Sequence, residues 1–131
     1  MALLIDTSIL VELERADALS PPELESEEVH LSAISASELL HGVERASTAI
    51  RRARREAFVE RVLDSVPVLA FDLEVARVHA RVWADLSRRG AMIGGHDLII
   101  AATALRHDLA VVTRNRGEFT RVEGLDVRGL E

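Results

Sequence analysis

The 131-residue chain contains no cysteine. This absence excludes disulfide bonds and metal sites built on thiolates, and it fits a protein of the reducing cytoplasm. Long apolar runs are also missing, since no stretch approaches the roughly 20 residues that a transmembrane helix needs. Met1 is followed at once by an apolar segment, without the basic start and cleavage site of a signal peptide. We therefore expect a cytoplasmic protein that has no membrane partner.

Lysine is the second absence. All 16 basic residues are arginine, and the 22 acidic residues give a net charge of −6. An acidic chain is unusual for a nucleic-acid-binding protein, which normally carries a basic surface. However, four arginines cluster at Arg51, Arg52, Arg54 and Arg55. Such a cluster is compatible with a solvated helix face and equally with contacts to a phosphate backbone, so the charge balance leaves both open.

Short apolar segments alternate with amphipathic segments along the chain. The run at residues 2–8 is wholly apolar up to Asp6, which indicates a central strand buried on both faces. Further strands are predicted at residues 29–32, 68–71, 110–113 and 125–127. Helices are expected after the caps Thr7 and Ser8, after Ser35, over 50–63, from Asp72 to Gly90, and over 98–105. This alternation predicts one α/β domain over residues 1–131, a three-layer α/β/α sandwich with a central parallel sheet.

Four acidic residues lie where these elements meet. Asp6 and Glu118 follow strands, Asp97 opens a helix, and Glu38 completes a capping-box pattern that starts at Ser35. The carboxyl ends of parallel strands share one edge of a sheet, so these acids are expected to converge. Two carboxylates about 4 Å apart repel by about 4 kcal/mol at an effective dielectric constant of 20. Convergence therefore requires either protonation or a bound cation.

Ligands that are all oxygen atoms favour a hard cation, Mg²⁺ or Mn²⁺. Such an ion activates water and polarises phosphoryl oxygens, which makes phosphodiester hydrolysis the natural reaction class. Each acid also has a simpler explanation. Asp6 and Asp97 could be plain helix caps, Glu38 only the far member of a capping box, and Glu118 a residue of a surface loop.

The chain resembles a known family at Leu4–Ser8, Ser37–Leu39, Gly95–Ala104, Thr113–Asn115 and Glu118–Phe119. These segments look like the PIN-domain ribonucleases and, within them, the VapC-type toxins of bacterial toxin–antitoxin pairs. The resemblance covers the whole chain in order. It implies an endoribonuclease that depends on Mg²⁺, for which Mn²⁺ may substitute, and that a VapB-like antitoxin inhibits. RNA is then the substrate, and apolar helix surface beyond the needs of the core would serve a homodimer.

The resemblance also implies roles for individual residues. Asp6, Glu38 and Asp97 match the acidic positions that bind metal and catalyse cleavage in the family. Glu118 matches a fourth position, where the family often has Asp, and direct or water-mediated metal binding by the longer side chain is left open. Thr7, Thr113 and Asn115 match supporting polar positions that orient a carboxylate or a water.

Two other functions are compatible with part of this pattern. Enzymes that form an aspartyl phosphate also place an Asp after the first strand, but they rely on a lysine near the phosphate, and this chain has none. A catalytically silent PIN-like module that binds RNA or protein would keep the fold. It would have no reason to retain mutually repelling acids, and this favours the enzyme.

Overall fold

The computed structural model describes residues 2–18, 24 and 26–130. Five short strands form one parallel sheet in the order β3-β2-β1-β4-β5. The strands are β1 (Ala2–Ile5), β2 (Glu28–Ser32), β3 (Val68–Leu69), β4 (Ala110–Val112) and β5 (Val127–Arg128). The helices are α1 (Thr7–Ala16), α2 (Ala33–Glu44), α3 (Ala49–Ser65), α4 (Leu73–Arg88), α5 (Gly95–His107) and α6 (Arg116–Phe119).

Strand β1 lies at the centre of the sheet and shows why the sheet is covered on both sides. Leu3, Leu4 and Ile5 are at most 1% exposed. Successive side chains of a strand point to opposite faces. Leu3 and Ile5 accordingly pack into a core with α1, α2 and α3, whereas Leu4 packs into a second core with α4, α5 and α6. The predicted central strand is therefore confirmed.

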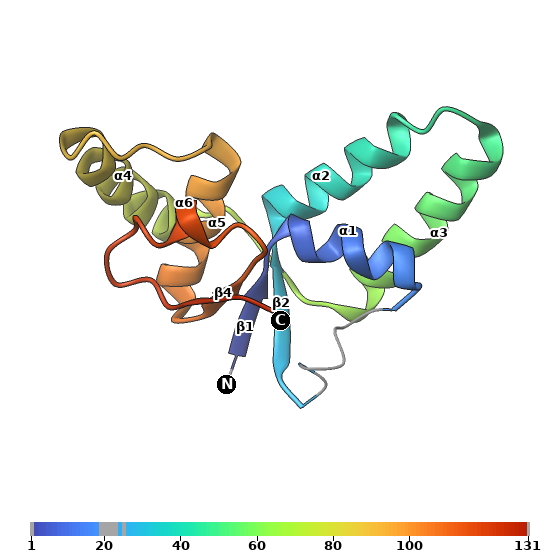
Figure 1. Ribbon diagram of the computed structural model, residues 1–131, viewed down its shortest axis with the longest axis horizontal. Helices are drawn as coiled ribbons and strands as arrows, with labels where there is room; N and C mark the ends of the chain where they lie inside the picture. The colour runs from blue at the N-terminus through green and yellow to red at the C-terminus, as the bar shows by residue number, and fades with distance from the viewer. Residues whose placement is uncertain (1, 19–23, 25, 131) are drawn as a thin grey trace.

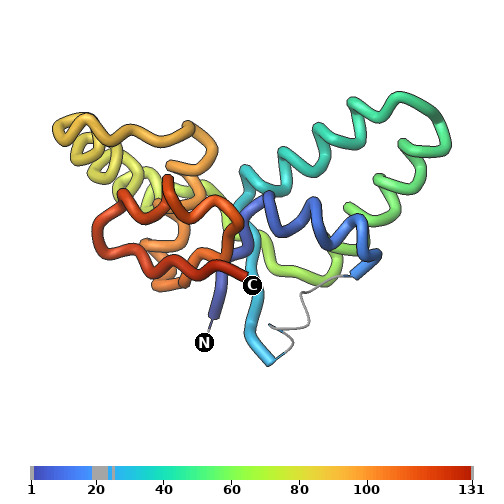
Figure 2. Tube along the Cα trace, in the orientation of Figure 1, coloured from blue at the N-terminus to red at the C-terminus, as the bar shows by residue number. Residues whose placement is uncertain are grey.

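The two cores give the molecule three layers. In Figure 1, α1, α2 and α3 lie on one side of the strands, and α4, α5 and α6 lie on the other. The chain trace in Figure 2 shows α2 and α3 as an antiparallel hairpin that projects away from the sheet. The expected α/β/α sandwich with a central parallel sheet is confirmed. Within the described part of the chain, no helix combines the length and apolar composition needed to cross a bilayer.

Two predicted helix starts are wrong. Asp6, rather than Thr7 or Ser8, caps α1, because its backbone is extended and its side chain accepts the N–H group of Thr7, the first residue of the helix. Ser32 caps α2 by accepting the N–H group of Ile34 at 3.2 Å, so the cap lies three residues before the predicted cap at Ser35.

The edge strands also differ from the prediction. β3 stops at Leu69 because its partner β2 ends at the paired residue Ser32, which leaves residues 70 and 71 without a ladder. β5 is shifted by a residue or two toward the C-terminus, where Val127 and Arg128 pair with Val111 and Val112.

Candidate acidic site at the sheet edge

Asp6 ends the central strand and is held firmly in place. Asp6 is buried, with 5% of its surface exposed. The backbone N–H group of Thr7 donates to Oδ1 at 2.7 Å. The hydroxyl groups of Ser8 and Thr113 donate to Oδ2 at 2.9 and 2.7 Å. These three donors satisfy the buried carboxyl oxygens and fix the orientation of the side chain.

The turn after β4 joins Asp6 to Glu118. Thr113 is fully buried, and its hydroxyl oxygen accepts the backbone N–H group of Asn115 at 2.8 Å while it donates to Asp6. The side-chain nitrogen of Asn115 lies 3.4 Å from Oε2 of Glu118. The two supporting residues predicted on this turn therefore lie between the acids.

Glu38 reaches the same region from α2. Its Oε1 lies 3.1 Å from the hydroxyl oxygen of Thr7, which is also 3.4 Å from the hydroxyl oxygen of Ser35. Nδ1 of His96 lies 3.7 Å from Oε1 of Glu38. Because α2 starts at Ala33, Glu38 is in the second turn and does not close a capping box with Ser35. The structure brings Glu38 beside Thr7, and the alternative explanation of Glu38 as the far member of a capping box is wrong.

Asp97 and Glu118 share a hydrogen bond at the start of α5. Burial, followed by the hydrogen bond to Glu118, raises the pKa of Asp97 to about 7. The negative charges of Asp6, Glu118 and Glu38 raise it further. The hydrogen bond from Asp97 lowers the pKa of Glu118, with help from the N–H group of Gly94. Burial and this hydrogen bond therefore favour the protonated form of Asp97 and the ionised form of Glu118.

Four acids from four elements thus meet at the carboxyl edge of the sheet. The starts of α1 and α2 lie beside the ends of β1 and β2 in Figure 1, with α5 and α6 across from them. Repulsion from the three other carboxylates adds to the effects of burial and of the Glu118 hydrogen bond in raising the pKa of Asp97. Protonation is one way to relieve this repulsion, and a bound cation is the other.

The donor set suits a hard divalent cation, since the converging ligands are all carboxylate oxygens. Among the residues that the structure describes, however, no three acidic or histidine side chains are spaced as a ready-made metal cage. Asp6 is held by three donors, whereas Glu38 and Glu118 have long side chains. To surround a cation with oxygen atoms, the side chains of Glu38 and Glu118 would therefore have to move toward it.

Three residues of the site were not among the predicted functional residues. Ser8 donates to Asp6, and its hydroxyl oxygen accepts the N–H group of Arg114 at 3.1 Å, which ties α1 to the turn after β4. Ser35 is fully buried beside Thr7, and Gly94 supplies a backbone donor to Glu118. The spacing of Ser35 and Glu38, three residues apart on one helix face, is the signal that could have found Ser35.

Known proteins resemble this chain over nearly its whole length. The model of the PIN domain family matches residues 3–125. Ribonuclease VapC1 of Rickettsia felis is 37% identical over 97% of this chain and 95% of its own length. The tRNA(fMet)-specific endonuclease VapC of Salmonella typhimurium is 33% identical over 74% of this chain and 71% of its own length.

A solved structure agrees with these matches. It is VapBC-5 of Mycobacterium tuberculosis, described as a member of the VapBC family of toxin–antitoxin systems. It superposes with a TM-score of 0.77 and is 32% identical over 99% of this chain and 98% of its own. The fold, the acidic sheet edge and the family match agree, and the chain belongs to the PIN domain family.

Proposed function

We propose that this protein is an endoribonuclease toxin that hydrolyses RNA phosphodiester bonds and is inhibited by a cognate antitoxin. The observation that carries the proposal is the convergence of Asp6, Glu38 and Glu118 on Asp97. Burial first, then the hydrogen bond to Glu118 and the charges of these acids, raise the Asp97 pKa to about 7. Carboxyl groups perturbed in this way cluster at functional sites. Two of the related proteins are a ribonuclease and an endonuclease, which supports the same reaction class.

Mg²⁺, for which Mn²⁺ may substitute, is the proposed cofactor, held by Asp6, Asp97, Glu38 and Glu118. A divalent cation bound there would lower the pKa of a coordinated water and offset charge on the phosphate. Asp6 supplies a carboxyl group that three hydrogen bonds hold in a fixed orientation. Asp97 must lose its proton to act as a ligand, so cation binding and proton release are coupled. Thr7, Thr113 and Asn115 orient the carboxylates.

An antitoxin and a second copy of the chain are the proposed protein partners. The structural relative comes from a toxin–antitoxin system, which supports an antitoxin. The homodimer is supported by apolar side chains on and before α4, where Phe71, Leu73 and Trp83 are 46%, 64% and 54% exposed. Exposed apolar groups this close together commonly mark a protein interface.

The homodimer is tested by light scattering on purified wild type and on Trp83→Arg combined with Leu73→Arg. We expect a dimer for the wild type and a monomer for the variant. Ile50→Arg is the matched control, because Ile50 is 68% exposed on α3, on the other side of the sheet. A monomeric wild type, or a variant that stays dimeric, contradicts this interface.

The nuclease is tested by mapping new RNA 5′ ends in cells after brief expression without the antitoxin. We expect new ends with the wild type and none with Asp97→Asn at matched expression. Purified protein should cleave RNA only when Mg²⁺ or Mn²⁺ is added, and excess EDTA should stop the reaction. If the folded wild type produces no new ends and binds RNA or protein without cleaving, the catalytically silent module is correct. Full activity of Asp97→Asn would overturn the site assignment.

A further inference from the structure

A groove between α1 and α3 collects arginines on the side of the molecule that carries the projecting hairpin. Its volume is about 640 Å³. Five of its lining residues are Arg15, Arg51, Arg54, Arg55 and Arg61, and two are the carboxylates of Glu14 and Asp17. Guanidinium groups therefore outnumber carboxylates by three here, although the whole chain has a net charge of −6. The groove is a local reversal of the protein's charge.

The two carboxylates are already paired. Nε of Arg55 lies 3.1 Å from Oε1 of Glu14, and its Nη1 donates to the carbonyl oxygen of Gly42 at 2.9 Å. Arg61 pairs with Asp17. Arg55 and Arg61 are therefore engaged in holding α3 against α1 and α2.

The other three guanidinium groups remain available. Among the described residues, the guanidinium group of Arg51 has one hydrogen-bond partner, the neutral hydroxyl of Ser47 at 3.1 Å. Arg15 and Arg54 are exposed, and neither makes a hydrogen bond or ion pair with any other residue that the structure describes. Three unpaired cations in one groove are a ready surface for a polyanion.

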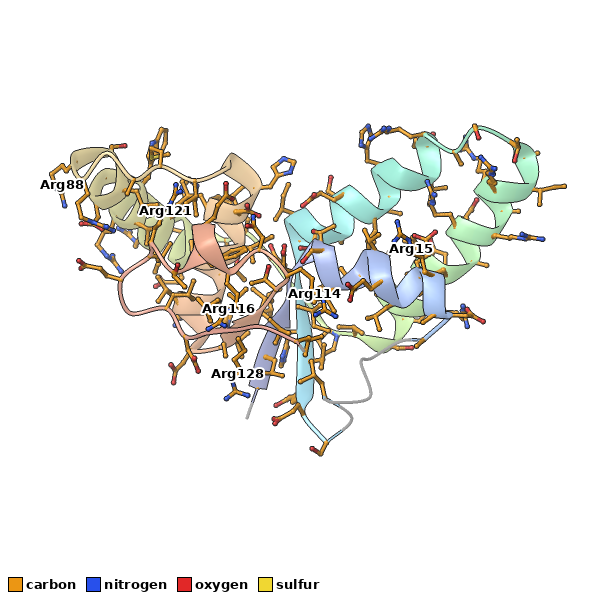
Figure 3. The ribbon with its side chains drawn as sticks, in the orientation of Figure 1. Arg15, Arg88, Arg114, Arg116, Arg121 and Arg128 are labelled. Atoms are coloured by element: carbon orange, nitrogen blue, oxygen red, sulfur yellow. The ribbon has the colours of Figure 1, made fainter. Side chains whose placement is uncertain are left out.

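The groove is connected to the acidic site through α1. Asp6 caps this helix at the site, and Val11 and Arg15 line the groove further along it. At a rise of about 1.5 Å per residue, Arg15 lies roughly 13 Å from Asp6 along the helix axis. Figure 3 shows Arg15 on the side of α1 that faces the α2–α3 hairpin. A strand a few nucleotides long spans this distance.

We propose that Arg15, Arg51 and Arg54 bind the phosphate backbone of the RNA strand whose cleaved bond lies at the acidic site. The inference rests on the proposed nuclease function and adds a second contact for its substrate. Four carboxylates repel an approaching polyanion, so productive binding needs positive charge close to them but outside the site. Guanidinium groups match phosphate oxygens with two parallel hydrogen bonds.

The lining favours RNA over an acidic helical peptide. A helix that docks in a groove anchors itself through apolar side chains three and four residues apart, which need apolar pockets. Phe58 is only 3% exposed, and Val11 is the one large apolar side chain among the described lining residues that is exposed. The side chains exposed in the groove are therefore mainly charged.

The experiment measures the affinity of the full chain for a fluorescent 20-nucleotide single-stranded RNA at several salt concentrations, in the Asp97→Asn background so that cleavage does not interfere. The test variant adds Arg15→Gln, Arg51→Gln and Arg54→Gln. The control variant instead adds Arg77→Gln, Arg81→Gln and Arg88→Gln, which remove the same charge from α4, at the far side of the molecule in Figure 3. Light scattering checks that both variants keep the same mass.

We expect the test variant to bind at least about tenfold more weakly at low salt, since several charge-assisted hydrogen bonds are lost. The slope of log affinity against log salt should shrink by about 2, because each lost phosphate contact on a single strand removes about 0.7. The control should change both quantities far less. Equal losses in the two variants would mean a non-specific charge effect and would overturn the proposal.

Two further outcomes separate this inference from the proposed nuclease. If the wild type cleaves RNA and the test variant binds with unchanged affinity and slope, the groove proposal fails and the nuclease stands. If the test variant also loses binding to the antitoxin while keeping RNA affinity, the groove belongs to a protein partner. If the wild type never cleaves RNA but the test variant alone loses RNA affinity, the groove stands and the nuclease fails.

Discussion

The helical layers on the two faces of the sheet are built in opposite ways. Helix α5 buries six of its 13 residues, and four of these six, residues 101–104, are the small residues Ala, Ala, Thr and Ala. Helix α3 buries only Phe58, Val59 and Val62 out of 17 residues and carries the arginine cluster on its exposed surface. Small side chains let α5 lie close against the sheet, whereas α3 meets the core through one narrow stripe.

The two helical layers therefore have different tasks: α5 holds an acidic residue of the site in place, and the α2–α3 hairpin offers a binding surface. Asp97 stands on the buried helix, so the acid with the raised pKa is held by the packing of the whole face. The projecting α2–α3 hairpin contributes one apolar stripe to the core, with Leu39, Val43, Phe58, Val59 and Val62, and presents charged surface elsewhere. The α5 face should therefore respond strongly to substitution in stability and activity together, and the hairpin should respond mainly in binding.

The largest expected effect is in the core beneath α5. Ile100→Ala should lower the free energy of unfolding by about 2–5 kcal/mol, because Ile100 is 0% exposed and its truncation leaves a cavity. Ile50→Ala, on the exposed start of α3, should change it by less than about 0.5 kcal/mol. Urea unfolding of both variants tests the comparison. Similar losses at the two positions would show that the faces do not differ as described.

A smaller effect is expected inside the site. Thr113→Val should cost about 1–2 kcal/mol, because it removes a buried donor to Asp6 and the acceptor for the N–H group of Asn115. It should also slow RNA cleavage, as Asp6 loses one of three donors. Thr120→Val is the control, since its hydroxyl contacts only the exposed carbonyl of Gly117. Wild-type stability and cleavage in Thr113→Val would argue against an orienting role.

The acidic cluster makes stability depend on pH in metal-free buffer. The pKa of Asp97 is about 7 in the folded protein and 3.8 as an ordinary value, so the folded state binds the proton more tightly. The stabilisation by Asp97 is therefore complete below about pH 4 and is lost as pH rises toward 7. Asp97→Asn carries no titrating group, so its stability relative to wild type should increase over this interval. A pH-independent difference between the two, measured by urea unfolding in EDTA, would contradict the cluster's electrostatics.

The smallest effect is expected on the hairpin. Arg55→Met should cost no more than about 1 kcal/mol, because the ion pair of Arg55 with Glu14 is partly exposed to solvent. Arg54→Met should be neutral, since Arg54 has no partner among the described residues. Thermal denaturation of the two variants side by side measures the difference. A loss at Arg54 as large as at Arg55 would mean that the cluster stabilises the fold.

Much of the architecture follows from local signals in the chain. The apolar run ending at Asp6 predicts a doubly covered strand, and the structure places it at the centre of the sheet. The Gly-Gly pair before Asp97 and the apolar segment after it predict a helix start close to where α5 begins. These signals work because a strand end and a helix start are properties of a few neighbouring residues.

The start of α2 shows where local signals stop. Ser32 and Ser35 are both good capping residues, and the Glu38 three residues after Ser35 favoured the later start. The end of β2 determines which serine is the cap. The pairing of β2 with β3 extends to Ser32, and α2 begins at the next residue, Ala33. That pairing depends on residues more than 35 positions away, and no pattern around Ser35 contains this information.

The list of acids and their positions at element boundaries could be obtained from the chain alone, because hydrophobic periodicity and capping chemistry act over a single turn or strand. The raised pKa of Asp97 beside Glu118 and the groove of arginines between α1 and α3 could not. Both arise where segments distant in sequence are brought together, and burial, charge repulsion and ion pairing depend on those distances in space. These distances are determined only when the whole chain folds.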